Sequence, residues 1–500
     1  MNPRKRIVFF GCFLFLFLLV LPVSAEQADH AGTALESTGF SAPALLKDKN
    51  ERTYTATSGE ASVTLTNSAG IGSVYIVFDK IPSPWTITDG TQTFTCGENG
   101  FLHEFTDVQA LFGDTPTSLV LTFPGGTSVD EIYGFTAGEL PGWVQIWLPP
   151  CAEADLLLFS SHSDDEQLFF AGILPLYAVE RDLAVQVVYI VNHFDTYNRP
   201  HEQLDGLWAV GVRHYPIIPA FPDLYSESLE GAISAYASRG YSYEDFCQYI
   251  TDCLRRFRPQ VVISHDIEGE YGHGTHILCT AALMDSLLYA NDPVMYPESA
   301  QMYGTWDVPK TYLHLYTENQ IVLDLDVPLE SFGGKTAFQV TQDGFAHHKS
   351  QHWTWFYKWI YGTTDAPITK AAQINYLSPC RYGLYRSTVG ADVIGGDFFE
   401  NLTSYAQQAA IREEEAKETE TLPETEETAP VVSVVVPETE EETEKNPPDI
   451  QYTAPDRELS PVIFVLLGGI AFILFLVIFL HVFMYTTWKK KRKQNKRRRK

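Results

Sequence analysis

The chain has 500 residues, 20% of them charged, and a formal net charge of -28. Such an acidic surface repels other polyanions, so nucleic acid is excluded as a partner. The length allows about two or three domains. The six cysteines that follow Cys12 lack the close spacing of a zinc cluster or of a small disulfide framework.

Residues 1–25 are typical of a signal peptide. Basic residues at Arg4, Lys5 and Arg6 precede an apolar run, and Val23-Ser24-Ala25 offers the small residues of a cleavage site. A first transmembrane helix that is not removed is the alternative interpretation. We therefore leave these residues out of the fold prediction.

Residues 26–48 indicate a loose spacer, and residues 49–150 indicate a small all-β module. In the module, short runs rich in β-branched and aromatic residues are separated by Gly, Pro, Asn and Asp, without a convincing helix. This pattern predicts an antiparallel β-sandwich. Exposed aromatic side chains on the module would suit sugar binding, and a purely structural role fits the pattern equally well.

An α/β pattern extends through residues 151–405. Apolar runs at Leu156 to Ser160, Ala184 to Val191 and Gln260 to Ser264 alternate with helical periodicity, as at Tyr243 to Phe257. Strands that alternate with helices predict a Rossmann-like, mostly parallel sheet with helices on both faces. In such a sheet the ligand site lies at the carboxyl ends of the strands.

The C-terminal part divides into a stalk, an anchor and a tail. Residues 406–460 are rich in Glu, Thr and Pro, and their charge repulsion predicts a disordered, extended stalk. Residues 461–487 are apolar and long enough for a transmembrane helix, although a buried core helix is the alternative. The basic residues 488–500 would be cytoplasmic by the positive-inside rule. We therefore expect a single-pass protein of the cell membrane whose folded domains are extracellular.

A cluster of polar side chains follows the first strand of the α/β pattern. His162 and Asp165 stand three residues apart at a predicted strand-to-helix turn, so both side chains can face one point. Imidazole and carboxylate are a common partial ligand set for a hydrolytic zinc ion, which keeps one position open for water. Asp164 points differently and could act as a base. Capping of a helix N-terminus is an alternative role for the same acidic run.

A second cluster, from Ser264 to His276, follows the third strand. It holds three His, three acidic residues and Tyr271, interspersed with three glycines. Glycine permits a close approach of backbone to ligand, as an active-site loop requires. Together the two clusters could supply a third metal ligand, and Asp266 and Glu270 could orient imidazoles from behind.

Both motifs resemble those of the PIG-L/LmbE family of zinc-dependent N-acetylglucosaminyl deacetylases. The matching segments are His162-Ser163-Asp164-Asp165-Glu166 and Gly269-Glu270-Tyr271-Gly272-His273-Gly274-Thr275-His276, each directly after a strand. The likeness covers roughly residues 152–400 and includes Arg199-Pro200-His201-Glu202.

The resemblance implies a role for each matched position. His162, Asp165 and His276 would bind Zn²⁺, and Asp164 would be the general base that activates the attacking water.

Three further positions are implied to contact the substrate or its transition state. Tyr271 and His273 match positions that stabilise the tetrahedral intermediate or assist departure of the amine. Arg199 matches a substrate-binding arginine.

Two positions depart from the family pattern. Ser163 stands where the family usually has Pro, which changes loop stiffness and removes no ligand. Gly274 and Thr275 replace a Pro-Asp pair whose Asp would tune a neighbouring histidine. The second departure bears on rate and pH optimum rather than on metal binding.

These observations predict a membrane-anchored extracellular hydrolase that removes the N-acetyl group from an N-acetylglucosamine-type sugar or glycoconjugate. Two alternatives stay open: a catalytically weak glycan-binding surface protein, and a deacylase of a different N-acyl substrate. Two His and one carboxylate suit zinc best, with iron and manganese as alternatives.

Overall fold

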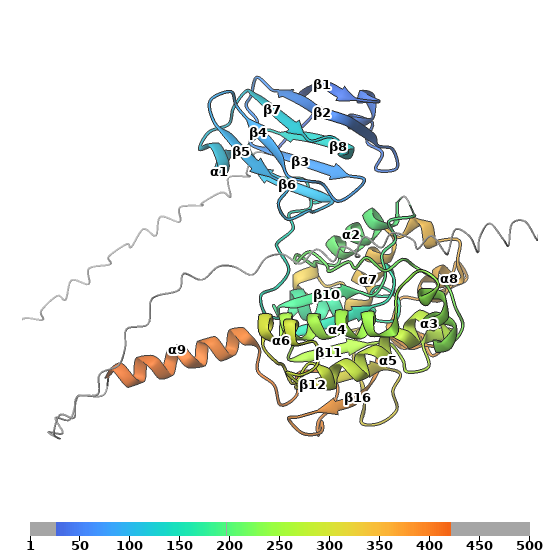
Figure 1. Ribbon diagram of the computed structural model, residues 1–500. Coiled ribbons are helices and arrows are strands. Elements are labelled where there is room, and N and C mark those ends of the chain that lie inside the picture. The colour runs from blue at the N-terminus through green and yellow to red at the C-terminus, as the bar shows by residue number, and fades with distance from the viewer. Residues whose placement is uncertain (1–26, 197, 422–500) are drawn as a thin grey trace, which may run out of the picture. The chain divides into compact units, whose positions relative to one another are not determined.

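The computed structural model describes residues 27–421 except residue 197. The N-terminal part forms an antiparallel sheet of eight strands, and the following part forms a mixed sheet of six strands with helices around it (Figure 1). A two-stranded ribbon, β14 (Gly362–Thr363) and β15 (Ala366–Pro367), belongs to neither sheet.

The N-terminal sheet has the strand order β5-β4-β7-β2-β8-β3-β6, and β1 pairs with β2. Its strands are β1 (Ala34–Phe40), β2 (Thr55–Thr66), β3 (Ser73–Phe78), β4 (Trp85–Thr88), β5 (Thr93–Cys96), β6 (His103–Asp107), β7 (Ser118–Phe123) and β8 (Ser128–Phe135). The short helices η1 (Pro43–Lys47) and α1 (Val108–Phe112) complete the module.

This topology corrects the predicted two-sheet β-sandwich. Strand β2 is 12 residues long and lies between two halves of the module, β5-β4-β7 on one side and β8-β3-β6 on the other. Thr55 and Ala56 pair with β8, whereas Ala61 to Thr66 pair with β7. One long strand therefore joins the halves into a single curled sheet. Residues 26–48, predicted as a spacer, contain β1 and η1 instead.

The interior of this module is filled by aromatic and branched side chains. Val63 and Leu65 are buried on one face of β2, and Phe123 of β7 stacks on Trp85 of β4 with ring centroids 5.5 Å apart. Trp85 donates its indole N–H to the Glu104 carboxylate at 3.3 Å. A buried indole needs such a partner, because an unsatisfied N–H would offset part of the gain from burial.

The second sheet has the strand order β10-β9-β11-β12-β16-β13. Its strands are β9 (Leu156–Ser160), β10 (Val185–Tyr189), β11 (Val261–Ser264), β12 (Lys310–His314), β13 (Gln320–Val322) and β16 (Arg381–Ser387). The first four in this order are mutually parallel, whereas β16 runs antiparallel to both β12 and β13.

The predicted Rossmann-like parallel sheet is therefore wrong, because the sheet is mixed. Strand β16 comes from the far end of the domain and inserts between β12 and β13, with Tyr382 opposite His314 and Ile321. Its sequence buries only Tyr382, Gly383 and Leu384 and includes two arginines, so the strand has no continuous apolar run that would predict it.

Helices pack around the sheet and connect its strands. They are α2 (Arg199–Ala209), α3 (Leu229–Ala237), α4 (Tyr243–Phe257), α5 (Gly274–Tyr289), α6 (Pro297–Tyr303), α7 (Ala337–Phe345) and α8 (Trp355–Tyr361). The helix predicted at Tyr243 to Phe257 coincides with α4. Ser242 starts α4 with a capping box, in which Asp245 returns a hydrogen bond to the Ser242 backbone. The short helical segments are η2 (Pro175–Glu180), η3 (Glu270–Gly272), η4 (Glu330–Phe332), η5 (Lys349–Gln351) and η6 (Ala371–Gln373).

The predicted stalk begins differently from the expectation. Helix α9 (Tyr405–Thr421) occupies the start of residues 406–460. Ala, Gln, Glu and Lys, which dominate this stretch, are good helix formers, and this propensity outweighs charge repulsion there. The remainder of the predicted stalk lies outside the described residues.

The expected localisation as a single-pass membrane protein is corrected as well. Among residues 27–421, no helix combines the length and the apolar character needed to cross a bilayer. The predicted span at 461–487, the signal peptide at 1–25 and the basic tail at 488–500 lie outside the described residues.

The register of the parallel strands places the two polar motifs side by side. Leu156, Leu157 and Leu158 of β9 pair with the corresponding residues of β11. Both strands end at the same edge of the sheet, so the loops that follow Ser160 and Ser264 leave it together. This edge is where a parallel sheet binds its ligands.

Candidate active site

Three side chains converge at this edge. Nδ1 of His162 lies 3.1 Å from Oδ2 of Asp165 and 3.0 Å from Nε2 of His276. The third separation, from Nε2 of His276 to Oδ2 of Asp165, is 3.2 Å. All three residues are buried. The structure thus brings together the three positions that the sequence predicted as metal ligands.

The triangle of donor atoms fits a small metal ion. Tetrahedral zinc with bonds of ~2.1 Å separates its ligand atoms by roughly 3.4 Å, slightly more than the observed spacing. Two overlapping groups of side chains could hold an ion here: one combines His162 with His273 and His276, and the other combines Asp165 with His265 and His276. Two imidazoles and a carboxylate are a donor set that zinc accepts readily.

Carboxylates behind the histidines orient the rings. Oε2 of Glu270 lies 2.8 Å from Nδ1 of His276, which leaves Nε2 of that ring free to face the site. Oδ1 of Asp223 lies 3.4 Å from Nε2 of His162, which leaves Nδ1 to face the same point. Carboxylates in this position fix the tautomer of a metal-binding histidine and raise its basicity.

The charges of these carboxylates perturb the pKa values of the cluster. Burial alone would lower the pKa of His162, but Asp223 and Asp165 outweigh burial and raise it to about 10. Burial likewise opposes ionisation of Glu270, yet its contacts with His265, His276 and His314 hold the pKa of that carboxyl well below its usual range. The pocket therefore favours a positive charge at its centre.

Asp164 lies beside this triad rather than within it. Its backbone has φ of 149°, a region that residues other than glycine rarely adopt, which turns its side chain away from that of Asp165. Burial raises the pKa of Asp164 to about 6, although the Arg199 guanidinium, 3.2 Å from Oδ1, lowers it. A buried carboxylate with such a pKa is suited to accept a proton near neutral pH.

Arg199 begins helix α2 and reaches back to the first motif. Its Nη2 donates to the backbone carbonyl of Ser163 at 2.7 Å as well as approaching Asp164. The arginine thus holds both the loop and the carboxylate in place. It is partly buried, and its guanidinium faces Asp164 rather than bulk solvent.

His273 caps the N-terminus of α5 and lies next to the triad. The backbone N–H of Thr275 donates to its Nδ1 at 3.3 Å, so the proton of the neutral ring resides on Nε2. Burial, together with His162 and His276, lowers the pKa of His273 to about 2. His273 is therefore a neutral hydrogen-bond donor in this cluster.

The structure explains the departure at Gly274 and Thr275. The N–H of Gly274 donates to the carbonyl of Ser226 at 2.8 Å. Proline could not form this hydrogen bond because it has no backbone N–H. A Cβ at position 274 would come within 1.9 Å of the Ser226 hydroxyl. Thr275 is buried and donates its hydroxyl to the carbonyl of Leu224 at 3.2 Å, so its side chain points away from His273.

Tyr271 forms an aromatic wall beside the cluster. Its ring lies 5.6 Å from that of His276 and 5.9 Å from that of Trp355, and it is 37% exposed. The backbone of Tyr271 has φ of 49°, the left-handed region. Burial and the surrounding carboxylates raise the pKa of its hydroxyl above its usual range, so the phenol stays protonated.

Several residues of this site carry no motif that identifies them in the sequence. Asp223 comes from the loop before α3, and His314 ends β12, where its Nδ1 lies 2.6 Å from Oε1 of Glu270. His193 accepts a hydrogen bond from the backbone N–H of Ser163 at 3.2 Å. Of these residues, only His314 had a signal in the sequence that could have identified it: it ends a strand, and strand ends meet at this edge of the sheet.

Buried candidate metal ligands beside a buried carboxylate are an arrangement that suits a metal-dependent hydrolase. Comparison with known families agrees: residues 157–287 match the PIG-L family, described as GlcNAc-PI de-N-acetylase. The matched segment contains both motifs. This match confirms the resemblance to the PIG-L/LmbE family that the sequence predicted.

Curated relatives carry related names. The 1D-myo-inositol 2-acetamido-2-deoxy-alpha-D-glucopyranoside deacetylase 2 of Saccharopolyspora erythraea is 42% identical over 69 residues, or 14% of this chain and 24% of the relative. The deacetylase of Geodermatophilus obscurus that is named for the same compound is 26% identical over 179 residues, or 31% of this chain and 60% of the relative. The match thus spans from about a quarter to three fifths of these relatives.

A solved structure with a similar name was also found. The N,N'-diacetylchitobiose deacetylase from Pyrococcus horikoshii is 15% identical, with a TM-score of 0.33, and the match covers 52% of this chain and 90% of that chain. The curated names and the family description all refer to deacetylases, in agreement with the enzyme class that the sequence predicts.

Proposed function

We propose that this chain is a metal-dependent N-deacetylase that hydrolyses the acetamide of an N-acetylglucosamine-type sugar or glycoconjugate. One observation carries the proposal: three donor atoms, on His162, Asp165 and His276, lie within 3.2 Å of one another beside the buried carboxylate of Asp164. Ligands and base come from two separate motifs and meet at the edge of the sheet.

The ligand set suits Zn²⁺, held by His162, Asp165 and His276. A bound zinc ion supplies a Lewis acid for the amide carbonyl and makes water a stronger acid. Glu270 and Asp223 lie against the outer nitrogens of His276 and His162, so each ring would present its other nitrogen to the ion. The match to the PIG-L family and the donor set support this assignment.

Asp164 is the proposed general base. Its carboxylate takes the proton from the attacking water, because it is buried next to the ligands and ionises near pH 6. The same group then returns the proton to the departing amine nitrogen. Arg199 steadies the carboxylate between the two transfers and keeps it from rotating out of the site.

His273 and Tyr271 are the proposed donors to the developing oxyanion. The Nδ1 of His273 already accepts from the Thr275 N–H, so its Nε2–H is the group that can donate. Tyr271 keeps its phenolic proton and lies beside the same histidines. Donors held in place before the reaction stabilise charge without the cost of reorganisation.

Acetate release tests this proposal directly. Purified full-length protein is loaded with Zn²⁺, incubated with a panel of N-acetylated sugars that includes N-acetylglucosamine, chitooligosaccharides and N-acetylglucosaminyl inositol, and assayed for acetate. Asp164→Asn should lower the rate by about 10²–10⁴-fold while the protein retains its zinc. Asp195→Asn, a change at an exposed residue of the neighbouring loop, is the matched control and should leave the rate unchanged.

Two results would refute the proposal. One is a zinc-loaded wild-type protein that releases no acetate from any member of the panel. The other is an Asp164→Asn variant that retains full activity, which would leave the reaction without the base assigned to it. Repeating the assay with Fe²⁺ and Mn²⁺ identifies the metal that supports the highest rate.

A further inference from the structure

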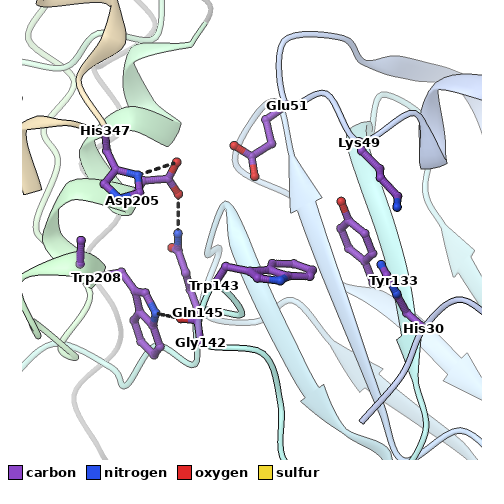
Figure 2. Close-up of a pocket in the computed structure, with 11 residues that line it drawn as sticks. His30, Lys49, Glu51, Tyr133, Gly142, Trp143, Gln145, Asp205, Trp208 and His347 are labelled. Atoms are coloured by element: carbon purple, nitrogen blue, oxygen red, sulfur yellow. Dashed lines mark hydrogen bonds and ion pairs between the residues drawn. The ribbon is translucent and has the colours of Figure 1, made fainter. Parts of the chain in front are cut away.

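A cavity lies next to helix α2, between that helix and the N-terminal sheet module (Figure 2). Its volume is about 620 Å³, within the range of pockets that bind small molecules. None of its lining residues belongs to the catalytic cluster. The side chains that line it and carry the argument are Glu51, Tyr133, Trp143, Gln145, Asp205 and His347.

Hydrogen bonds between the two walls define the shape of this cavity. Gln145 donates its side-chain amide to Oδ1 of Asp205 at 2.6 Å, and Trp208 of α2 donates its indole N–H to the carbonyl of Gly142 at 2.9 Å. His103 and His201 meet beneath them, with Nε2 of the first 2.9 Å from Nδ1 of the second. The module and the helix are therefore bonded at several points around the opening.

An exposed indole provides a flat apolar surface in the cavity. Trp143 is 47% exposed, and edge-on packing against Tyr133 and Tyr75, at centroid distances of 5.1 and 5.9 Å, supports its ring. An indole fixed in this way loses little conformational freedom when a ligand stacks on it. The C–H face of a pyranose ring is the complementary surface for a rigid, half-exposed aromatic ring.

Polar groups surround this surface at the positions where sugar hydroxyls would lie. Glu51 points toward the cavity from the sheet module, and Asp205 and His347 face it from the helical side (Figure 2). Oδ2 of Asp205 lies 3.8 Å from Nδ1 of His347. A carboxylate can accept hydrogen bonds from two adjacent hydroxyls, as a sugar ring presents them.

Helix α2 connects this cavity to the candidate active site. Its first residue, Arg199, contacts Asp164, and Asp205 lies six residues further along. At a rise of ~1.5 Å per residue the two positions are separated by about 9 Å along the helix axis. His347 is adjacent to His348, whose Nε2 lies 3.5 Å from Glu166 of the first motif. A short oligosaccharide has the length to reach from one place to the other.

We propose that the cavity lined by Trp143, Glu51 and Asp205 is a sugar-binding subsite, which holds a neutral or amino-bearing ring of a glycan whose acetamido group occupies the catalytic site. The proposal rests on the proposed function for the choice of glycan, but the binding event requires no turnover. The indole stacks on one face of the ring, and the carboxylates accept hydrogen bonds from its hydroxyl or amino groups.

Calorimetric titration of the full-length Asp164→Asn variant tests the subsite without hydrolysis. The probes are N-acetylglucosamine and its β-1,4-linked dimer, trimer and tetramer. The longer oligomers should bind at least tenfold more tightly than the monosaccharide. Adding Trp143→Ala should weaken tetramer binding by about tenfold and leave monosaccharide binding unchanged. Trp353→Ala, at an indole that is 85% exposed and outside the cavity, is the matched control and should bind like the parent.

A conservative second variant distinguishes loss of binding from loss of folding. Glu51→Gln keeps the size of the side chain and should also weaken tetramer binding, with an unchanged far-UV spectrum and melting temperature. Equal affinity for all four probes, or affinities that neither Trp143→Ala nor Glu51→Gln alters, would overturn the subsite. Because binding is measured without turnover, lack of acetate release by the wild type would count against the proposed function alone.

Discussion

Glu270 Oε2 lies 2.8 Å from Nδ1 of His276, and the same buried carboxylate also contacts Nδ1 of His265 and Nδ1 of His314 at 2.7 and 2.6 Å. One carboxylate thus orients three imidazoles, two from the second cluster and one from the end of β12. Its position links the second motif to the end of β12.

Glu270→Gln should weaken zinc binding by about 10–100-fold, because the amide cannot accept from three ring nitrogens or supply a negative charge. Competition with a chromogenic zinc chelator measures the affinity. Glu268→Gln, at an exposed position of the same loop, is the control and should bind zinc like the wild type. An unchanged affinity in Glu270→Gln would show that the histidines are oriented without this carboxylate.

Arg199→Met should move the acidic limb of the pH–rate profile to higher pH. Burial raises the pKa of Asp164 to about 6 and Arg199 lowers it, so removal of the guanidinium raises it further. The base works only when deprotonated, and the rise of kcat/KM with pH should therefore occur later in the variant. Arg52→Met removes a largely exposed arginine that faces Glu202 instead of Asp164, and its profile should match the wild type.

Thr275→Asp should not improve the enzyme, although it restores an acidic residue of the family motif. The Thr275 hydroxyl donates to the carbonyl of Leu224, so a carboxylate there would be buried against a second acceptor. We expect a loss of about 3 kcal/mol in the free energy of unfolding, measured with urea, and no gain in kcat. Thr275→Ser retains the donor and should stay near wild-type stability. A faster, equally stable Thr275→Asp variant would contradict this account.

His103 should make the fold sensitive to acid. Burial and the neighbouring His201 lower the pKa of His103 from its ordinary value of 6.5 to about 3. Below pH 6.5 the unfolded chain therefore binds a proton at this position that the folded chain does not, and stability falls as the pH drops from 6.5 toward 3.

The matching experiment compares His103→Gln with the wild type at pH 7.5, 6.5 and 5.5, with urea denaturation as the readout. The variant should lose less stability over this interval, because it has no proton to take up at position 103. His352→Gln, which changes a histidine that contacts neither His103 nor His201, should show the same pH dependence of stability as the wild type. Parallel pH profiles for wild type and His103→Gln would rule out His103 as a source of the acid sensitivity.

The helix at Tyr243 to Phe257 was predicted at the bounds of α4, because its apolar periodicity is a local signal. The β-sandwich and the parallel sheet were predicted wrongly for a common reason. Which strands pair depends on partners far away in sequence, as with β2, which joins two halves, and β16, which inserts between β12 and β13.

Local chemistry in the sequence determined the two motifs, their order and the side chains His162, Asp164, Asp165 and His276 at the ends of strands. Those residues lie within short segments, so their type and spacing are visible without a fold. Asp223, His314 and the cavity beside Trp143 could be assigned only from the tertiary structure. Each depends on side chains from distant segments, which meet only when the sheet edge and helix α2 are in place.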